Sequence, residues 1–368
     1  MKFNPHRLSL ARRRRGLNKK TLASLIGVCP RTVVDYEREE GIDPSTEILS
    51  KIAKELDFPV EFFFAESLDE PCLDGVSFRA FSNLTAKYRD ASLSASVIAT
   101  SLNDWIESRY DLPAPRIPDL RGEEPEAAAE AVRIEWGLGN AAIKNLVHQL
   151  ESNGVRIFSL PKDSQRLDAF CFWRTETPFI FLNTSKSSER SRFDAAHELA
   201  HLVLHRHGQI QGREVETEAD RFASAFLMPK ESVLSVAPSF ITLETLIKMK
   251  RLWNVSVAAL NHRIHTLKIT SDWHYRQLCI QISERGFRKK EPLGGVHETS
   301  KILQIVLSDL RKEGISRSQI AKELHIYSNE LNSYLFGLVI STLDGGGSSG
   351  RSRASLRLLD SMDSEASG

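Results

Sequence analysis

Residues 192–201 read Arg-Phe-Asp-Ala-Ala-His-Glu-Leu-Ala-His, and this stretch decides the fold of the second half of the chain. Its apolar positions recur at helical spacing, and Ser187 or Ser188 can cap the helix that they predict. Residues four apart lie one above the other on a helix, so His197 and His201 can bind one metal ion. His-Glu-x-x-His is typical of a zinc site, although a short motif also occurs by chance on a buried helix.

Glu198 is the residue of this stretch that predicts chemistry. It projects beside the two histidines, where its carboxylate can take a proton from a zinc-bound water and pass it to a leaving amine. Zinc lowers the pKa of such a water toward about 7, so the reaction can run at neutral pH. We therefore expect zinc as the cofactor, His197 and His201 as ligands and Glu198 as the catalytic residue.

A zinc ion held by two histidines needs a third protein ligand and keeps one position for water. Residues 214–229 predict a second helix that ends at its closing proline, with Glu216 and Glu218 on opposite flanks of its apolar stripe. Glu216 shares its flank with Asp220, a carboxylate that can hold a zinc-bound histidine in one tautomer. We expect Glu216 to be the third ligand. Glu218 is the alternative, and an acid near a helix start can also simply favour the helix dipole.

Two further histidines follow the first pair. His205 continues the four-residue series but lies a further turn along the helix, where the same metal ion cannot reach it. We therefore expect His205 to lie at the surface or behind the ligands, and His207 is a weaker candidate still.

The stretch 192–229 resembles the ImmA/IrrE metallo-endopeptidases. The resemblance is carried by Arg-Phe-x-x-Ala-His-Glu-Leu-Ala-His at its start and Glu-x-x-x-Asp-x-Phe-Ala-x-x-Phe-Leu-Met-Pro at its end. It implies a zincin-like peptidase domain in which Glu198 is the catalytic acid and base and zinc is bound by His197, His201 and Glu216. Ala200 stands where glycine is frequent in that family, a mild change because alanine is the better helix former.

The N-terminus is strongly polarised in charge. Residues 1–38 carry ten Lys or Arg against two acids, a local balance of +8, whereas the whole chain has a net charge of +1. Residues 39–70 reverse the sign, with ten acids against two lysines. One face of this region can therefore meet phosphates while another avoids them. The four consecutive arginines at 12–15 would, on their own, read as a solvated charge run.

The pattern around these arginines predicts a helix-turn-helix. Residues 17–28 read as a capped helix that ends at Gly27, and a second helix starts at Pro30. Two short helices joined through a glycine have this arrangement. Residues 43–46 then cap another amphipathic helix, and an aromatic segment follows at 58–64.

This region resembles the five-helix Cro/C1-type (XRE) DNA-binding domain over about residues 7–64. The resemblance implies that the helix from Pro30 reads the major groove of double-stranded operator DNA, with Arg31 and Thr32 near base edges. The remaining expected DNA contacts are basic and lie nearer the backbone: Arg12, Arg13, Arg14, Arg15, Lys19 and Lys20. The alternative is a helical protein-interaction module that keeps the fold without binding DNA.

The spacing of apolar residues and the positions of turn residues predict the helices and strands of the rest of the chain. We expect helices near 78–106, 125–136, 140–152, 241–253 and 256–267, and strands at 155–158, 169–173 and 178–182, the last two paired through a turn. An exposed edge of that sheet can pair with an extended substrate, although Phe170 and Phe172 read equally well as core residues. The fold class is mainly α (α+β), divided into domains 1–68, 69–122 (helical connector), 123–269 (peptidase), 270–343 (helical module with a helix-turn-helix cadence) and 344–368 (disordered tail).

Composition is that of an ordinary globular chain, with 41% hydrophobic and 26% charged residues. No stretch of the sequence resembles a signal peptide or a membrane-spanning helix, and the four cysteines have no framework spacing. We therefore expect a cytoplasmic homodimer, nucleoid-associated when bound to DNA: a transcriptional regulator with a zinc endopeptidase domain that cleaves a repressor-type protein. The alternative is an antitoxin-like partner of a toxin whose zinc site is structural or silent.

Overall fold

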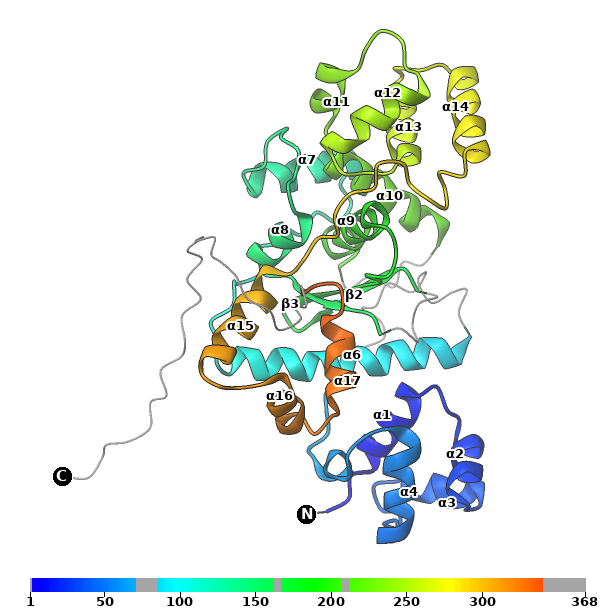
Figure 1. The fold of residues 1–368 in the computed structure, drawn as a ribbon, viewed down its shortest axis with the longest axis vertical. Helices are drawn as coiled ribbons and strands as arrows, with labels where there is room; N and C mark the ends of the chain where they lie inside the picture. The colour runs from blue at the N-terminus through cyan, green and yellow to red at the C-terminus, as the bar shows by residue number, and fades with distance from the viewer. Residues whose placement is uncertain (1, 71–84, 162–166, 207–211, 340–368) are drawn as a thin grey trace, which may run out of the picture.

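The computed structural model describes residues 2–70, 85–161, 167–206 and 212–339. It is mainly helical with one small sheet, which confirms the expected fold class (Figure 1). Residues 78–84 of the helix expected near 78–106, His207, one of the four cysteines (Cys72) and the 344–368 tail lie outside the described residues. Within them, no helix is both long enough and apolar enough to cross a bilayer.

The N-terminal domain contains the expected helix-turn-helix. The Asn18 side chain accepts a hydrogen bond from the backbone N–H of Thr21 and so starts α2, which ends at Gly27 with φ of +75°. The fifth element is a 3-10 helix rather than an α-helix. The elements are α1 (Pro5–Arg14), α2 (Lys19–Ile26), α3 (Pro30–Tyr36), α4 (Thr46–Leu56) and the 3-10 helix η1 (Val60–Phe64).

The sheet has three strands in the order β1-β3-β2: β1 (Arg156–Ser159), β2 (Ala169–Arg174) and β3 (Thr177–Leu182). β2 and β3 form the expected antiparallel hairpin, whereas β1 pairs with β3 in parallel. Thr175 in the hairpin turn has a φ of +53°. All three strands are almost completely buried, so apolar side chains occupy both faces of each strand instead of alternating with exposed polar ones.

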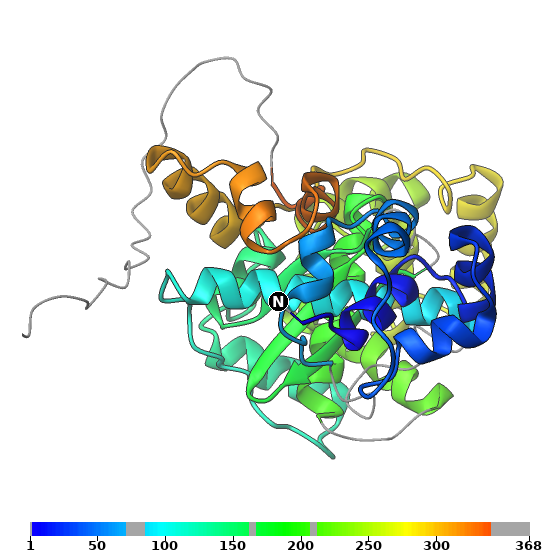
Figure 2. The ribbon, with the colours of Figure 1, turned by 90° about the horizontal axis from the view of Figure 1, so that it is seen from below.

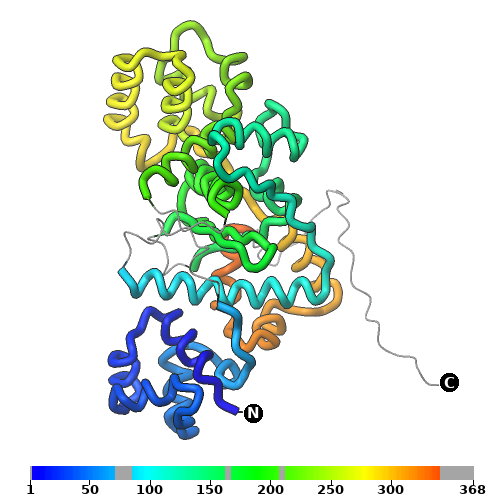
Figure 3. Tube along the Cα trace, turned by 180° about the vertical axis from the view of Figure 1, so that it is seen from behind, coloured from blue at the N-terminus to red at the C-terminus, as the bar shows by residue number. Residues whose placement is uncertain are grey.

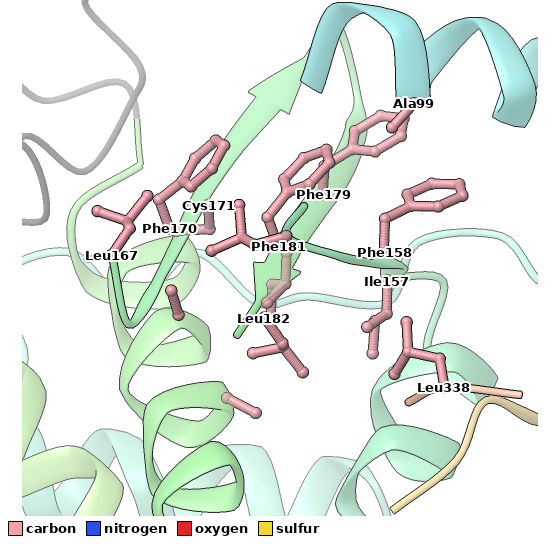
Figure 4. Close-up of a cluster of buried hydrophobic side chains, with 14 of the residues drawn as sticks. Ala99, Ile157, Phe158, Leu167, Phe170, Cys171, Phe179, Phe181, Leu182 and Leu338 are labelled. Atoms are coloured by element: carbon pink, nitrogen blue, oxygen red, sulfur yellow. The ribbon is translucent and has the colours of Figure 1, made fainter. Parts of the chain in front are cut away.

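Helices cover both faces of this sheet. Phenylalanine rings from β2 and β3 stack on one face, with Phe170 and Phe181 centroids 4.8 Å apart, and Ala99 of α6 (Ala86–Glu107) lies on that side (Figure 4). On the other face the Cys171 thiol donates a hydrogen bond to the Glu198 carbonyl in α9 (Ser188–Leu204) over 3.4 Å. The aromatic residues of β2 are therefore core residues, and the opposite face of the same strand contacts the helix that carries the His-Glu-x-x-His motif.

Around α9 lie α7 (Pro125–Glu135), α8 (Leu146–Ser152) and α10 (Arg213–Leu227). The helix expected at 140–152 begins only at Leu146. Asn145 accepts a hydrogen bond from the backbone N–H of His148 and caps the helix there, while residues 140–144 are not helical. The expected boundary was wrong because apolar periodicity alone does not locate a cap.

Seven more α-helices are described after α10. The expected helix at 241–253 is α12 (Leu243–Met249) with a 3-10 turn, η4 (Lys250–Leu252), and the one at 256–267 is α13 (Val257–Thr266). Two further helices, α11 (Lys230–Val236) and α14 (Asp272–Glu284), were not predicted as separate elements from the sequence. The last three helices are α15 (Lys301–Lys312), α16 (Arg317–Glu323) and α17 (Ser328–Leu335).

Helix α6 crosses between the N-terminal domain and the sheet, and α1 packs along it (Figures 1 and 3). α2, α3 and α4 lie on the side of the N-terminal domain that faces away from α6 (Figure 1). Seen from the side of that domain, α17 lies beside it, where Glu330 contacts Arg14 and Arg15 (Figure 2). α17 also contacts β1, so this C-terminal module touches both the N-terminal domain and the sheet.

Candidate metal centre and nucleic-acid interface

The His-Glu-x-x-His motif lies on α9, a helix that is buried along most of its length. Ser187 accepts a hydrogen bond from the backbone N–H of Arg190 and so starts the helix where the sequence predicts. His197 and His201 are one turn apart, and their Nε2 atoms lie 3.1 Å from each other. The two imidazoles therefore point to one place.

Glu216 reaches the same place from α10, which packs directly against α9. Its Oε2 atom lies 3.1 Å from His197 Nε2, and its Oε1 atom lies 3.7 Å from His201 Nε2. One ligand atom from each of the three residues lies within 4.8 Å of the other two. Two imidazole nitrogens and one carboxylate oxygen are a donor set suited to a catalytic zinc ion, which leaves its fourth position open.

The charge around the histidines also suits a cation. Burial by itself lowers the pKa of His197, but hydrogen bonds to Asp220 and Glu216 outweigh that effect and raise the pKa to about 10. A pocket that favours a positive charge so strongly on an imidazole favours a metal cation in the same way. The residues present therefore fit zinc.

Glu198 is only 4% exposed and lies next to this cluster. Burial raises the pKa of its carboxyl to about 7, although the charge of His197 opposes the shift. Its Oε2 atom is buried and has no hydrogen-bond partner among the described residues. An unpaired buried carboxylate oxygen costs free energy unless a water or another polar group bonds to it, so this atom is able to accept a proton from a neighbouring group.

Three polar side chains stand behind the ligands. Asp220 Oδ1 lies 2.9 Å from His197 Nδ1, the position that the sequence predicts for it. Glu218 is not in the ligand cluster, because its Oε2 atom lies 2.9 Å from His205 Nε2. His205 Nδ1 in turn lies 3.1 Å from His201 Nδ1. The four-residue step from His201 to His205 was the sequence signal for this contact.

The expected DNA-reading residues lie at the starts of α2 and α3. Lys20 and Arg31 are exposed, and Thr32 is half-buried and contacts Cys29, whose Sγ atom lies 3.2 Å from its Oγ1 atom. Lys19 is half-exposed and pairs with Glu37 at 3.1 Å. The helices that carry these residues, α2 and α3, lie toward the end of the domain that faces away from α6 (Figure 1).

The four consecutive arginines depart from the expectation that they lie near the DNA backbone. Arg12 is buried and holds both carboxylate oxygens of Glu37, at 2.5 and 2.9 Å. Arg13 pairs with Glu70. Arg14 is 2% exposed and contacts Glu330 of α17 at 2.6 Å, and Arg15 contacts the same carboxylate at 2.8 Å. Buried charges require partners, so these side chains turn toward carboxylates of the chain itself.

Comparison with known families agrees with both sequence resemblances. Residues 8–63 match the helix-turn-helix family model, and residues 150–265 match the model of the IrrE N-terminal-like domain, a peptidase family. No curated protein matches the chain significantly. The chain thus joins an XRE-type helix-turn-helix domain to an ImmA/IrrE-like domain of metallopeptidase type, and the whole cluster of His197, Glu198, His201 and Glu216 falls within the second match.

Proposed function

We propose that the chain is a DNA-binding transcriptional regulator whose second domain is a zinc-dependent endopeptidase acting on a repressor-type protein in a stress or mobile-element response. The observation that carries this proposal is the convergence of three ligand atoms beside the unpartnered oxygen of Glu198. Structural zinc sites are closed by four protein ligands, whereas the cluster found among the described residues has three. A three-ligand site with a buried carboxylate beside it is suited to hydrolysis.

Zinc, when bound by His197, His201 and Glu216, polarises the scissile carbonyl and lowers the pKa of water. Glu198 takes the proton of the attacking water at Oε2 and delivers it to the nitrogen of the leaving amine. A carboxyl with a pKa of about 7 suits this work, because a group with a pKa near the working pH both accepts and releases a proton. Asp220 accepts from His197 Nδ1 and so keeps that imidazole oriented.

The substrate reaches this site along β2. β2 is an edge strand, and no described strand pairs with its outer side. Its Cys171 contacts the backbone of Glu198, so the strand runs beside the catalytic residue. Five of the six β2 residues are buried, so an extended polypeptide can add to this edge only once the edge is uncovered. It is then held through its backbone. Backbone pairing needs no chain terminus, which is why it suits cleavage in the middle of a substrate.

In this proposal the N-terminal domain binds a specific DNA sequence. Arg31 and Thr32 at the start of α3 contact base edges in the major groove, and Lys19 and Lys20 at the start of α2 contact phosphates. A single helix-turn-helix reads too few base pairs for high specificity. We therefore propose that the protein binds a palindromic operator as a homodimer.

The peptidase proposal is tested by comparing the wild-type chain with Glu198→Gln in the cells that naturally make it. Glu198→Gln keeps the metal ligands but removes the proton acceptor. Mass spectrometry of protein N-termini should reveal at least one new terminus, inside a regulatory protein, that appears with the wild-type chain and not with the variant. If the same termini appear with both chains, or with neither under inducing stress, the domain is not a working peptidase and the antitoxin-like function takes precedence.

A further inference from the structure

Behind the metal cluster, His201, His205 and Glu218 form a continuous line of polar contacts. His201 Nδ1 lies 3.1 Å from His205 Nδ1, and His205 Nε2 lies 2.9 Å from Glu218 Oε2. The His205 side chain is 8% exposed, whereas Glu218 is 40% exposed and has access to water. None of the catalytic steps described above uses His205 or Glu218.

The positions of the protons follow from the chemistry of imidazole. His201 directs Nε2 at the metal cluster, so this nitrogen must offer its lone pair and the ring proton must sit on Nδ1. A contact of 3.1 Å between two ring nitrogens is a hydrogen bond only if one of them carries a proton. His201 therefore donates, and His205 Nδ1 accepts.

The same reasoning applies one step further out. Because His205 accepts at Nδ1, its own proton sits on Nε2, and that N–H donates to the Glu218 carboxylate. Glu218 can only accept when ionised, so it fixes the tautomer of His205 and, through it, that of His201. The backbone supports the arrangement, since the His205 N–H donates to the His201 carbonyl over 3.1 Å at the end of α9.

The second ring nitrogen of each histidine ligand is thus connected to a carboxylate. His197 meets a carboxylate directly, through Asp220, whereas His201 meets one through an intervening imidazole. A bond from a ligand's second nitrogen to an acceptor sets the direction of the ring and increases the basicity of the nitrogen that binds the metal.

We propose that His205, held by Glu218, is a positioning residue that fixes the tautomer and orientation of His201 for metal binding. This inference rests on the proposed function, because it assigns His205 a role only if His201 is a zinc ligand. It does not require that the site cleave peptides.

The test is the zinc affinity of the full chain, measured by competition with a chromophoric chelator and with zinc alone as the probe. His205→Leu removes the acceptor, and we expect it to weaken zinc binding about 10- to 100-fold. His205→Asn places Oδ1 where Nδ1 stood and keeps an acceptor, so we expect an affinity within about threefold of the wild type. The cobalt(II)-substituted chain should show a shifted absorption band for His205→Leu and an unshifted one for His205→Asn, which a packing role would not produce.

Glu218 provides a second, independent pair of variants at a site with access to water. Glu218→Ala should weaken zinc binding, whereas Glu218→Gln, whose Oε1 can still accept from His205, should bind nearly as the wild type does. Glu214→Ala is the matched control, an exposed acid on the same helix that should leave the affinity unchanged. This set decides the question even if the His205 variants do not fold.

Two results would overturn the proposal: wild-type zinc affinity in His205→Leu and Glu218→Ala, or equal losses in His205→Leu and His205→Asn. Failure of the proposed function looks different. In that case the wild-type chain binds zinc, and the variants rank as expected, but no protein is cleaved.

Discussion

Two residue clusters stand out most in the sequence: the His-Glu-x-x-His motif of α9 and the four consecutive arginines at 12–15. In the structure the first cluster converges on one site, whereas the second is spread over separate partners. The histidines are one helical turn apart and converge on one point with Glu216. The arginines are consecutive, so each is rotated by about 100° from the one before and they point in different directions. Their partners accordingly lie in different parts of the chain, at Glu37, Glu70 and Glu330. Spacing that matches the helix period predicts which side chains lie on the same face, whereas a run of like charges does not predict where its side chains point.

Arg14 and Arg15 join the N-terminal domain to helix α17. Both contact Glu330, and Tyr334 donates a hydrogen bond to the same carboxylate over 2.5 Å. Helix α17, which carries Glu330, also contacts β1. Arg14 and Arg15, which the family resemblance placed near the DNA backbone, thus link the N-terminal domain to the C-terminal module and, through it, to the sheet.

The largest effect that separates the two clusters is expected for Glu330→Ala. The substitution leaves Arg14 buried without its carboxylate, and breaking a buried pair from one side costs about 3–5 kcal/mol. Urea unfolding of the full chain measures the loss. Glu47→Ala is the control, because its carboxylate pairs with Lys51 where the two side chains are 78% and 48% exposed, and such pairs contribute little to stability. Equal losses in the two variants would refute the role given to Glu330.

Acid should loosen the same contact. Burial raises the pKa of Glu330, but Arg14 and Arg15 outweigh burial and hold the pKa below its usual range. The stabilisation is therefore complete above the ordinary glutamate pKa of about 4.3 and is lost as the pH falls through the lower, folded-state value. Between these two pKa values, the free energy of unfolding of the wild-type chain should fall more steeply with decreasing pH than that of Glu330→Gln. Parallel pH curves for the two chains would contradict the expectation.

A smaller effect is expected at the DNA-reading surface. Arg31→Ala should cost about 1–3 kcal/mol of preference for the operator over unrelated duplexes, because one base-edge contact is lost. Footprinting of the full chain on the DNA upstream of its own gene identifies the site, and titration of matched and mismatched duplexes measures the preference. An unchanged preference would move the reading residues elsewhere on the domain.

The smallest effect is expected on the salt dependence of DNA binding, where the exposed Lys20 is compared with the buried Arg12. Lys20→Gln should weaken binding to all duplexes alike and reduce the slope of log K against log salt by about 1, as the loss of one phosphate contact does. Arg12→Gln should leave that slope unchanged, because Arg12 is buried against Glu37. If Arg12→Gln also lowers the slope while the domain remains folded, the arginine run contacts DNA after all.

The sequence predicts features that depend on near neighbours. The caps at Asn18 and Ser187 and the hairpin of β2 and β3 follow from short-range patterns and appear where expected. It does not predict the start of α8, since several residues before Leu146 could have begun a helix. Nor does it predict the contact of Arg14 with Glu330, which joins residues 316 positions apart and depends on how α17 packs. At the site, helical spacing suggested Glu216 over Glu218, but the pairing of Glu218 with His205 needed the packing of α9 on α10.

The central claim, that α9 and α10 together form a zinc site, is tested most directly by the metal content of the purified full chain and its variants. Elemental analysis should find about one zinc ion per wild-type chain, because the three ligands form a single site. We expect that His197→Ala, His201→Ala and Glu216→Ala each lose it, while the control Glu214→Ala and the variant Glu198→Gln keep a full equivalent. Full zinc in Glu216→Ala, together with its loss in Glu218→Ala, would contradict the site described here.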